Sequence, residues 1–465
     1  MRHPAFVLTA LLLMPALVAI AHSPPKNITT VETTTRLPQA EPFSFSDYSA
    51  NNHQSLTQRI AAIEEELQKR PNTAAVDKER AAEQPTFEIG GQLQVDYLWV
   101  GQDSDSRAAV GDVEDAIDIR RARLVARGEA YDVIVYMMGL DFALEGRPSL
   151  LDVWVGARDL PFLGQVRAGH FFEPFSLERK TQNTRNTFME RSLADAFAPA
   201  RNTGIEAYDS IGVDERATWA VGWFAAMSGN FGEQFTDSGG QALTTRATWL
   251  PYWDEASGGR SYVHLGAGYS YRTPPDGTFS FASFPEARSG TPSASNIPPF
   301  VSTGPIAGEH DQLCGVEFAW IHGPLYIQSE YIAVPVEQIG GPSLLFDAAY
   351  VNVSYFLTGE SRTYNKLFGI IDRVFPQENF FRVRNCEGPI VTGRGAWEIA
   401  GRYSYIDLDD ANIRGGRLHD FTIGLNWYLN PFTRMKWEVI QANLDRGPTG
   451  ESQAYIAGMR FDIDF

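Results

Sequence analysis

Cysteine and long apolar runs are both scarce in this chain. Cys314 and Cys386 are the only cysteines, too few for a disulfide framework, and the sequence leaves open whether they pair with each other. After residue 22, charge or glycine interrupts every apolar run within a few residues. The sequence therefore argues against a helical inner-membrane protein, which needs runs of about 20 apolar residues.

Motifs of the common enzyme classes are also missing. The chain has no G-x-S-x-G, H-E-x-x-H, P-loop or C-x-x-C pattern, and its eight histidines are scattered. We therefore expect a protein that is not an enzyme, with no catalytic residues, metal ligands or cofactors. The alternative is a serine and a histidine brought together across neighbouring strands, which sequence spacing does not exclude.

Positive charge is in deficit, because the formal net charge is −18. An excess of negative charge argues against nucleic acid as a partner. It does not settle the ion preference of a channel, because a channel selects by the charges on its narrowest wall.

The first 21 residues have the pattern of an export signal. Arg2 precedes an almost wholly apolar stretch from residue 6 to residue 20, and Ala19-Ile20-Ala21 is a small-x-small cleavage site. The apolar run of about 15 residues is shorter than the ~20 that span a bilayer. We expect residues 1–21 to be a cleaved signal peptide; an uncleaved anchor helix is the alternative.

Residues 22–86 show no strand pattern. Residues 22–52 are rich in Pro, Thr and Ser and are expected to form a flexible linker. In residues 53–70 the apolar positions are spaced by 4, 3 and 4, as in a coiled-coil seam; they are Leu56, Ile60, Ile63 and Leu67. This segment is expected to form a short helix, which either lies on another surface or joins protomers as a coiled coil. Residues 71–86 are a second linker.

Residues 87–465 alternate between apolar and polar positions with a period of two, and turn residues separate the segments. In the last segment Tyr455, Met459 and Phe461 share one face, whereas Arg460 and Asp462 lie on the other. Charged side chains cannot face lipid, so such a wall has a lipid face and a wet face. We count about sixteen strands: near 87–99, 117–128, 133–144, 150–158, 164–170, 201–209, 216–226, 241–249, 261–272, 311–321, 325–334, 345–358, 394–406, 417–429, 432–444 and 453–465.

These features predict an all-β fold, a 16-stranded antiparallel transmembrane β-barrel that follows a short N-terminal helix or coiled-coil segment. A barrel of sixteen strands is wide enough for an aqueous channel. Three connections are long, at about 171–200, 273–309 and 359–393. The first mixes aromatic and charged residues and is expected to fold into the lumen and narrow it, whereas the second, rich in Pro, Gly and Ser, has the composition of a surface loop.

Arginines gather in the segment IRRARLVARGEAYD. Arg121, Arg123 and Arg127 share a strand face in a regular strand, and Arg120 would lie on the opposite face. Guanidinium groups are tolerated in a wet lumen, where they form an electropositive track for anions or pair with acids of the wall such as Asp141. Both interpretations stay open. The candidates for pore-lining or anion-contacting residues are Arg121, Arg123, Arg127, Arg158, Arg167, Arg179, Lys180, Arg185, Arg191, Arg402 and Lys436, and the pattern also assigns Arg246, Arg272, Arg434 and Arg460 to the lumen.

The chain resembles the phosphate-selective porin O and P family of outer-membrane barrels over about residues 87–465. The resemblance rests on RRARLVARGEAYD, on RAGHFFEPFSLERKTQNTRNTFMERSLADAFAPARNTGIEAY, on SYFLTGESRTY and on the terminal Phe465. It implies a homotrimer, anion passage past a constriction at 171–200, and recognition of Phe465 by the barrel-assembly machinery. The chain departs from the lysine-rich narrow site of phosphate-selecting members, because its barrel region holds only Lys180, Lys366 and Lys436.

The sequence therefore predicts an exported porin of the bacterial outer membrane, in contact with lipid. Small solutes, with anions such as phosphate or polyphosphate as the candidates, would diffuse passively through a lumen narrowed by residues 171–200. The alternative is structural: a barrel anchor whose N-terminal coiled coil tethers the outer membrane to the cell wall.

Overall fold

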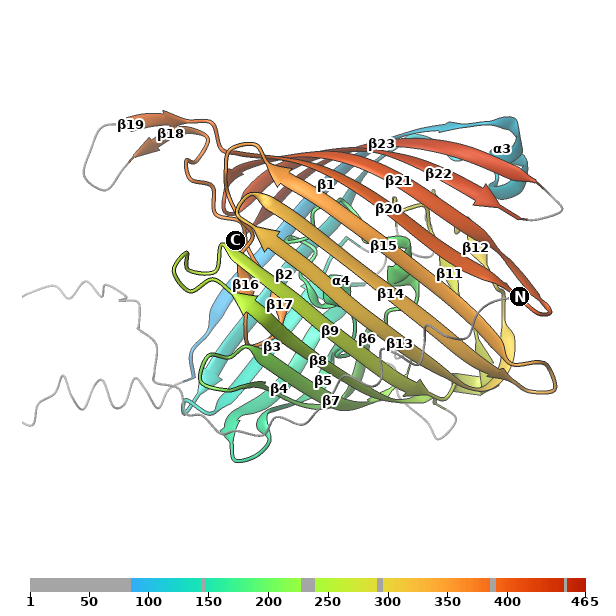
Figure 1. The fold of residues 1–465 in the computed structure, drawn as a ribbon, viewed down its shortest axis with the longest axis horizontal. Coiled ribbons are helices and arrows are strands. Elements are labelled where there is room, and N and C mark those ends of the chain that lie inside the picture. Colours follow the sequence, from blue (N-terminus) through green and yellow to red (C-terminus); the bar gives the residue numbers. More distant parts are fainter. Residues whose placement is uncertain (1–84, 144–146, 227–238, 291–295, 385–389, 447–449) are drawn as a thin grey trace, which may run out of the picture.

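A closed antiparallel barrel of sixteen long strands dominates the computed structural model of the chain (Figure 1). The structure describes residues 85–143, 147–226, 239–290, 296–384, 390–446 and 450–465. Each long strand pairs with its neighbours in the chain, and β1 closes the cylinder by pairing with β23 from Gln92 opposite Asp464 to Gln102 opposite Ala454. Closure leaves no strand edge, as a strand-built wall in lipid requires.

The barrel strands are β1 Glu88–Gln102, β2 Ala116–Ala130, β3 Ile134–Asp141, β4 Ser149–Leu160, β5 Gly164–Phe172, β6 Arg201–Ile211, β7 Ala217–Ala225, β8 Gln241–Trp253, β9 Ser261–Arg272, β13 Ile306–His322, β14 Leu325–Gln338, β15 Leu344–Phe356, β20 Ala396–Asp410, β21 Ile413–Asn430, β22 Thr433–Asp445 and β23 Glu451–Asp464. The connections hold α3 Ser104–Val110, α4 Leu177–Lys180, η1 Leu193–Ala196, η2 Pro275–Gly277, β10 Thr278–Phe279, β11 Ala282–Ser283, β12 Val301–Ser302, β16 Tyr364–Asn365, β17 Ile370–Ile371, β18 Phe381–Arg384 and β19 Ile390–Gly393.

The expected signal peptide (1–21), the linker (22–52), the short helix (53–70) and all but the end of the second linker (71–86) lie outside the described residues, as does Cys386. Cys314 lies in β13 and is half-buried. Among the described residues, no helix combines the length and apolar character needed to cross a membrane.

The predicted alternation of faces is confirmed in β23. Tyr455 and Phe461 are exposed on the outer face, whereas Arg460 and Asp462 are fully buried on the inner face. The outer face of the barrel is aromatic and aliphatic, and the inner face carries charged and hydroxyl groups. This arrangement suits a wall with lipid outside and a polar interior.

A β-bulge in β2 changes which arginines point inward. Gln94 of β1 pairs with Arg121 and the next residue, Val95, pairs with Ile119, so Arg120 is an extra residue in β2. Ile119 and Leu124 lie an odd number of positions apart and yet both face outward, at 56% and 46% exposure. The expectation that Arg120 lies on the outer face is therefore wrong: the bulge turns Arg120 and Arg121 together into the lumen.

The two ends of the barrel differ in their connections. Short turns at 131–133, 161–163, 323–324 and 431–432 lie at the end that holds the C-terminus, and in this class of barrel the short-turn end faces the periplasm. The opposite end carries the connections 173–200 and 273–305. The connection 357–395 breaks the pattern, because it is long and starts from the periplasmic end, where its β18–β19 hairpin projects beyond the barrel (Figure 1).

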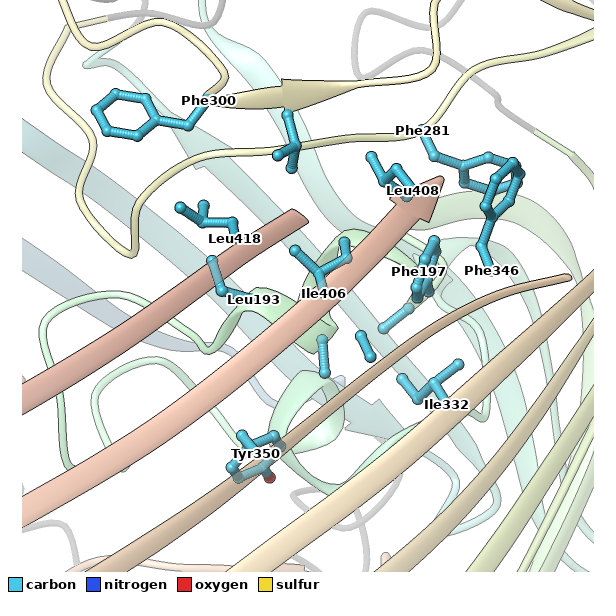
Figure 2. Close-up of a cluster of buried hydrophobic side chains, with 14 of the residues drawn as sticks. Leu193, Phe197, Phe281, Phe300, Ile332, Phe346, Tyr350, Ile406, Leu408 and Leu418 are labelled. Carbon is cyan, nitrogen blue, oxygen red and sulfur yellow. The ribbon is translucent and has the colours of Figure 1, made fainter. Parts of the chain in front are cut away.

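The connection 273–305, named the upper loop here, is packed inside the barrel mouth. Phe281 and Phe300 are buried against wall residues such as Leu408 and Leu418, as Figure 2 shows. The expectation of a surface loop is therefore wrong. Its Pro, Gly and Ser content indicated turns but did not reveal that the aromatic residues between them are buried.

The contact between the upper loop and residues 173–200 gives a test of this packing. Phe197 is 3% exposed and meets Phe281 edge to face, with ring centroids 5.5 Å apart. We expect Phe197→Ala to weaken docking of the upper loop by about 3–5 kcal/mol, because it leaves a cavity in this cluster. Limited proteolysis of the folded barrel should then show faster cleavage within 273–305. Ile423→Ala, on the exposed outer face, is the control; equal cleavage rates in both variants would contradict the expectation.

Candidate functional site

Residues 173–200, named the inner loop here, fold into the lumen and reach the far wall. The backbone N–H groups of Leu177 and Glu178 donate to the carboxylate of Glu330 in β14 at 3.0 and 2.7 Å. Further along, the N–H of Met189 donates to Glu438 in β22 at 2.9 Å. The prediction of an infolded loop is confirmed in its placement, since the loop that connects β5 to β6 is held by β14 and β22, which are not neighbours of those two strands.

Glycines of the wall make room for the inner loop. Cβ atoms built at Gly268 and Gly315 would come within 2.8 and 2.9 Å of the ring of Phe175. A Cβ at Gly458 would lie 2.9 Å from the sulfur of Met189. Because real Cβ atoms do not approach other atoms so closely, larger residues at these places would displace the loop. These glycines on the polar faces of the strands therefore leave the space that side chains of the inner loop occupy.

A cavity of about 630 Å³ lies between the inner loop, the upper loop and the wall. Five acidic residues line it, Asp141, Glu190, Asp195, Glu286 and Asp311, against eight arginines, Arg120, Arg121, Arg123, Arg179, Arg191, Arg201, Arg272 and Arg288. Arginines therefore outnumber acids among the residues that line this cavity, although the whole chain is acidic.

Most of these arginines have a carboxylate partner. Arg123 donates to Asp141 at 2.7 Å, which confirms the pairing that the sequence suggested. Arg201 pairs with Asp152 at 2.7 Å, and Arg272 pairs with Glu173 at 2.8 Å. In the inner loop, Arg179 and Arg191 share Asp195 at 2.8 and 3.7 Å. The predicted anion track is therefore largely a network of ion pairs.

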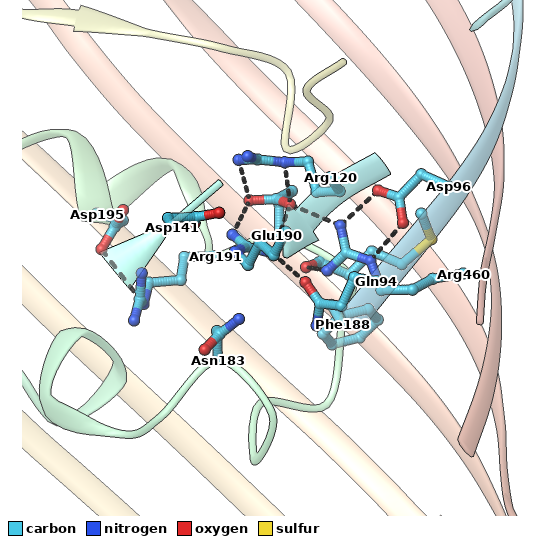
Figure 3. A network of polar contacts seen from close by, with 12 residues as sticks. Gln94, Asp96, Arg120, Asp141, Asn183, Phe188, Glu190, Arg191, Asp195 and Arg460 are labelled. Carbon is cyan, nitrogen blue, oxygen red and sulfur yellow. Dashed lines mark hydrogen bonds and ion pairs between the residues drawn. The ribbon is translucent and has the colours of Figure 1, made fainter. Parts of the chain in front are cut away.

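Glu190 of the inner loop is the centre of the largest network, drawn in Figure 3. Arg120, Arg121 and Arg460 converge on its carboxylate, at 3.0, 3.1 and 2.7 Å. Arg460 also forms two bonds with Asp96 of β1. Burial opposes ionisation of Glu190, but the three guanidinium groups outweigh burial and hold the pKa of this carboxyl well below its usual range.

A second cavity, of about 20 Å³, has room for about one water molecule. Lys180 and Arg167 line it, together with Phe368 from the connection 357–395. Burial and the guanidinium groups of Arg167 and Arg246 lower the pKa of the Lys180 ammonium to about 8, against the opposing effect of Glu206. Lys180 therefore lines a closely packed part of the lumen.

The connection 357–395, named the periplasmic loop here, enters the lumen and meets the inner loop. Arg362 is 1% exposed and pairs with Glu398 of β20 at 2.6 Å. Its other donors reach the carbonyl of Arg185 at 2.9 Å and the hydroxyl of Thr187 at 2.7 Å. One buried guanidinium therefore joins loops that start at opposite ends of the barrel.

The structure distributes the other predicted site residues over two places. Arg127 pairs with Glu88, and Arg158 with Glu129, at the periplasmic end, outside both cavities. Three more serve the inner loop. Arg402 donates to the carbonyl of Glu190. Lys436 donates to two carbonyls of the inner loop at 2.7 and 2.9 Å. Arg185 lies within the loop and pairs with Asp464 of β23 at 3.0 Å.

Arg288 is a site residue that the sequence pattern did not single out, because it lies in the upper loop, which had the composition of a surface loop. Its guanidinium lies 3.9 Å from the ring centroid of Phe284 and lines the large cavity. Among the described residues, no carboxylate or hydrogen-bond partner faces it within bonding distance. Burial lowers the pKa of the Arg288 guanidinium, and the nearby positive charges of Arg120 and Arg191 lower it further. The sequence does place Phe284 four positions before Arg288, and this spacing was the available sign that the two side chains meet.

A serine and a histidine do meet across neighbouring strands: the hydroxyl of Ser261 in β9 lies 3.2 Å from Nδ1 of His322 in β13, at the periplasmic end of the barrel. Within the described part of the chain, no group of three or more His, Cys, Asp or Glu side chains has the arrangement of a metal site. The polar groups of the lumen instead hold loops and line cavities. A closed barrel with an apolar outer face and a polar, loop-narrowed lumen defines an outer-membrane pore.

The chain belongs to the family described as phosphate-selective porin O and P, whose model matches residues 87–465. It is 26% identical over 404 residues to Porin O of Pseudomonas aeruginosa, covering 80% of this chain and 85% of that protein. It is 25% identical over 397 residues to an uncharacterised protein of Caulobacter vibrioides, covering 82% and 74%. Among solved structures, the outer-membrane channel DcaP of Acinetobacter baumannii aligns with a TM-score of 0.49 at 10% identity, over 82% of this chain and 97% of that one. The protein is therefore a porin of the bacterial outer membrane.

The Arg362 junction yields a prediction about the lumen. We expect Arg362→Met to free the periplasmic loop, because breaking a buried ion pair on one side costs about 3–5 kcal/mol. The single-channel conductance in planar bilayers should rise, since the loop then leaves the lumen more often. Arg414→Met, which alters an exposed arginine, is the control and should keep the conductance of the unaltered protein. A conductance unchanged by Arg362→Met would show that this pair does not hold the loop.

Proposed function

We propose that this porin passes small anions by passive diffusion from the outer face of the barrel to the periplasm. An anion enters the large cavity, exchanges part of its water shell for guanidinium N–H groups, and continues past the inner loop at Lys180. No covalent step is involved. Selectivity arises from wall charges and from the narrow passage.

The observation that carries the proposal is the charge of the large cavity, where arginines outnumber acids by eight to five. Field lines concentrate in a cavity with low-dielectric walls, so a modest local excess of positive charge attracts anions. Arg288 contributes to this attraction, because no ion pair joins its guanidinium to a carboxylate among the described residues. The net charge of −18 belongs to the chain as a whole and does not oppose this.

Phosphate and polyphosphate are the candidate solutes, and the family description supports phosphate. We propose that this chain binds phosphate only weakly. Most of its lumen arginines are paired with acids, and Lys180 is the only lysine that lines either cavity among the described residues. Arginine and lysine differ in hydration and geometry, so an arginine-based passage does not reproduce a lysine-rich site.

We further propose that the working form is a homotrimer in outer-membrane lipid, and that the barrel-assembly machinery inserts it after recognising the terminal Phe465. The carbonyl and N–H of Phe465 bond to Gly91, which places the last residue in the barrel seam. Chemical crosslinking of the protein in native membranes tests the assembly, and a single monomer band would contradict it.

Reversal potentials across planar bilayers test the proposed function. In a KCl gradient, the reversal potential of an anion-selective pore moves toward the equilibrium potential of chloride and away from that of potassium. Addition of phosphate should then reduce the chloride current in the millimolar range. A closed channel or a cation-selective channel would refute the proposal.

Arg288 provides a sharper test. We expect Arg288→Ala to lower the anion-to-cation permeability ratio by roughly fivefold, because one charge about 4 Å from an ion contributes about 1 kcal/mol in water. Arg127→Ala is the matched control, since this arginine pairs with Glu88 at the exposed periplasmic end. An equal fall in both variants would contradict the assignment of Arg288 to the anion path.

Lys180 predicts a pH dependence. Its pKa of about 8 means that the ammonium is charged below this pH and that the charge is lost as the pH rises through it. The anion-to-cation permeability ratio should therefore fall between pH 7 and pH 9. Lys180→Arg keeps the charge over this range and should give a flat profile. A fall of the same size in that variant would assign the titration to another group.

A further inference from the structure

The carboxylate of Glu190 lies in a cradle of guanidinium groups. Arg120 places Nε and Nη2 at 3.0 and 3.2 Å from its two oxygens, and Arg121 places Nη1 and Nη2 at 3.3 and 3.1 Å. Arg460 adds Nη2 at 2.7 Å. A guanidinium fork matches the oxygens of a carboxylate and of a phosphate equally well. The cradle is therefore built for an oxyanion, and a side chain of the protein occupies it.

Arg120, Arg121 and Arg460 differ in the hydrogen bonds that they would keep if the Glu190 carboxylate were removed. Arg460 keeps two bonds to Asp96, at 2.7 and 2.6 Å, and stays neutralised. Arg121 keeps a bond to the amide oxygen of Gln94, and Arg120 keeps no bonded carboxylate among the described residues. Loss of the Glu190 charge would thus leave two guanidinium groups without a bonded carboxylate in the wall of the large cavity.

The position of the inner loop at this point does not depend on the Glu190 carboxylate. The N–H of Met189 donates to Glu438 at 2.9 Å, and Lys436 donates to the carbonyl of Phe188 at 2.9 Å. Arg402 donates to the carbonyl of Glu190 at 3.1 Å. A change confined to the carboxylate therefore leaves the backbone anchors in place.

We propose that Glu190 is a tethered competitor that occupies an oxyanion site formed by Arg120, Arg121 and Arg460. The inference rests on the proposed passage of anions and adds the residue that sets how tightly they bind. A tethered group acts at an effective concentration in the millimolar range. Free phosphate must displace it, so the site attracts anions and releases them quickly, as conduction requires.

Glu190→Gln tests the proposal, because the amide keeps the shape and removes the charge. We expect inorganic phosphate to bind the purified full-length protein in detergent at least about tenfold more tightly by calorimetry, as two charge-assisted bonding partners become available. The phosphate concentration that halves the chloride current in bilayers should fall by the same factor. Glu190→Asp keeps the charge and should bind phosphate no more tightly than the unaltered protein.

Asp311→Asn is the matched control, since it removes a carboxylate from the wall of the same cavity without releasing an arginine from an ion pair among the described residues. If both neutral variants gain equally in phosphate affinity, the effect is one of general charge and the proposal fails. If Glu190→Gln gains nothing while the unaltered pore is anion-selective, the proposal fails and the proposed function stands. If the unaltered pore is cation-selective, the proposed function fails, and calorimetry on Glu190→Gln still decides the role of Glu190.

A misfolded variant is recognised by loss of the heat-dependent gel mobility that folded barrels show. Glu190→Ala is then the second variant, because it vacates the space of the carboxylate without adding atoms. Acetate carries the missing group and should compete with phosphate for this variant at millimolar concentration. Absence of acetate competition, with phosphate affinity equal to that of the unaltered protein, would overturn the proposal.

Discussion

Every other feature of this porin depends on one constraint: backbone N–H and C=O groups in lipid must find partners within the protein. The pairing of β1 with β23 satisfies the last of them and turns the sheet into a cylinder. Closure separates the alternating side chains into an outer set that meets lipid and an inner set that does not. Because the inner side chains do not meet lipid, they can carry charge, and these charged groups line the lumen.

Charge within the cylinder serves two purposes at once. Arginines of the wall hold the inner loop and the upper loop through their carbonyls and carboxylates, as Arg402 does with Glu190 and Glu286. A buried charge needs a partner, so each acid on a loop also neutralises part of the attraction for anions. Loops and their ion pairs consequently fill much of the lumen, which is not a plain water-filled tube.

The strand positions and the faces of most strands could be predicted from the sequence, because a period of two is a local property. The infolding of residues 173–200 was also predictable, since aromatic and charged residues together are unusual in an exposed loop. The position of Arg120 was not, because the break in the period of two between Ile119 and Leu124 does not say which residue of β2 lacks a partner in β1. Burial of the upper loop depends on contacts of Phe281 and Phe300 with Leu408 and Leu418, far away in the sequence.

The meeting of the inner and periplasmic loops at Arg362 has a mechanical consequence. A rigid cylinder transmits little movement along its axis, whereas two loops joined by a buried guanidinium form a link inside it. Displacement of the β18–β19 hairpin at the periplasmic surface is thereby connected to the segment that carries Arg185 and Thr187. The two ends of the cylinder are thus joined through its interior by side-chain contacts as well as through its wall.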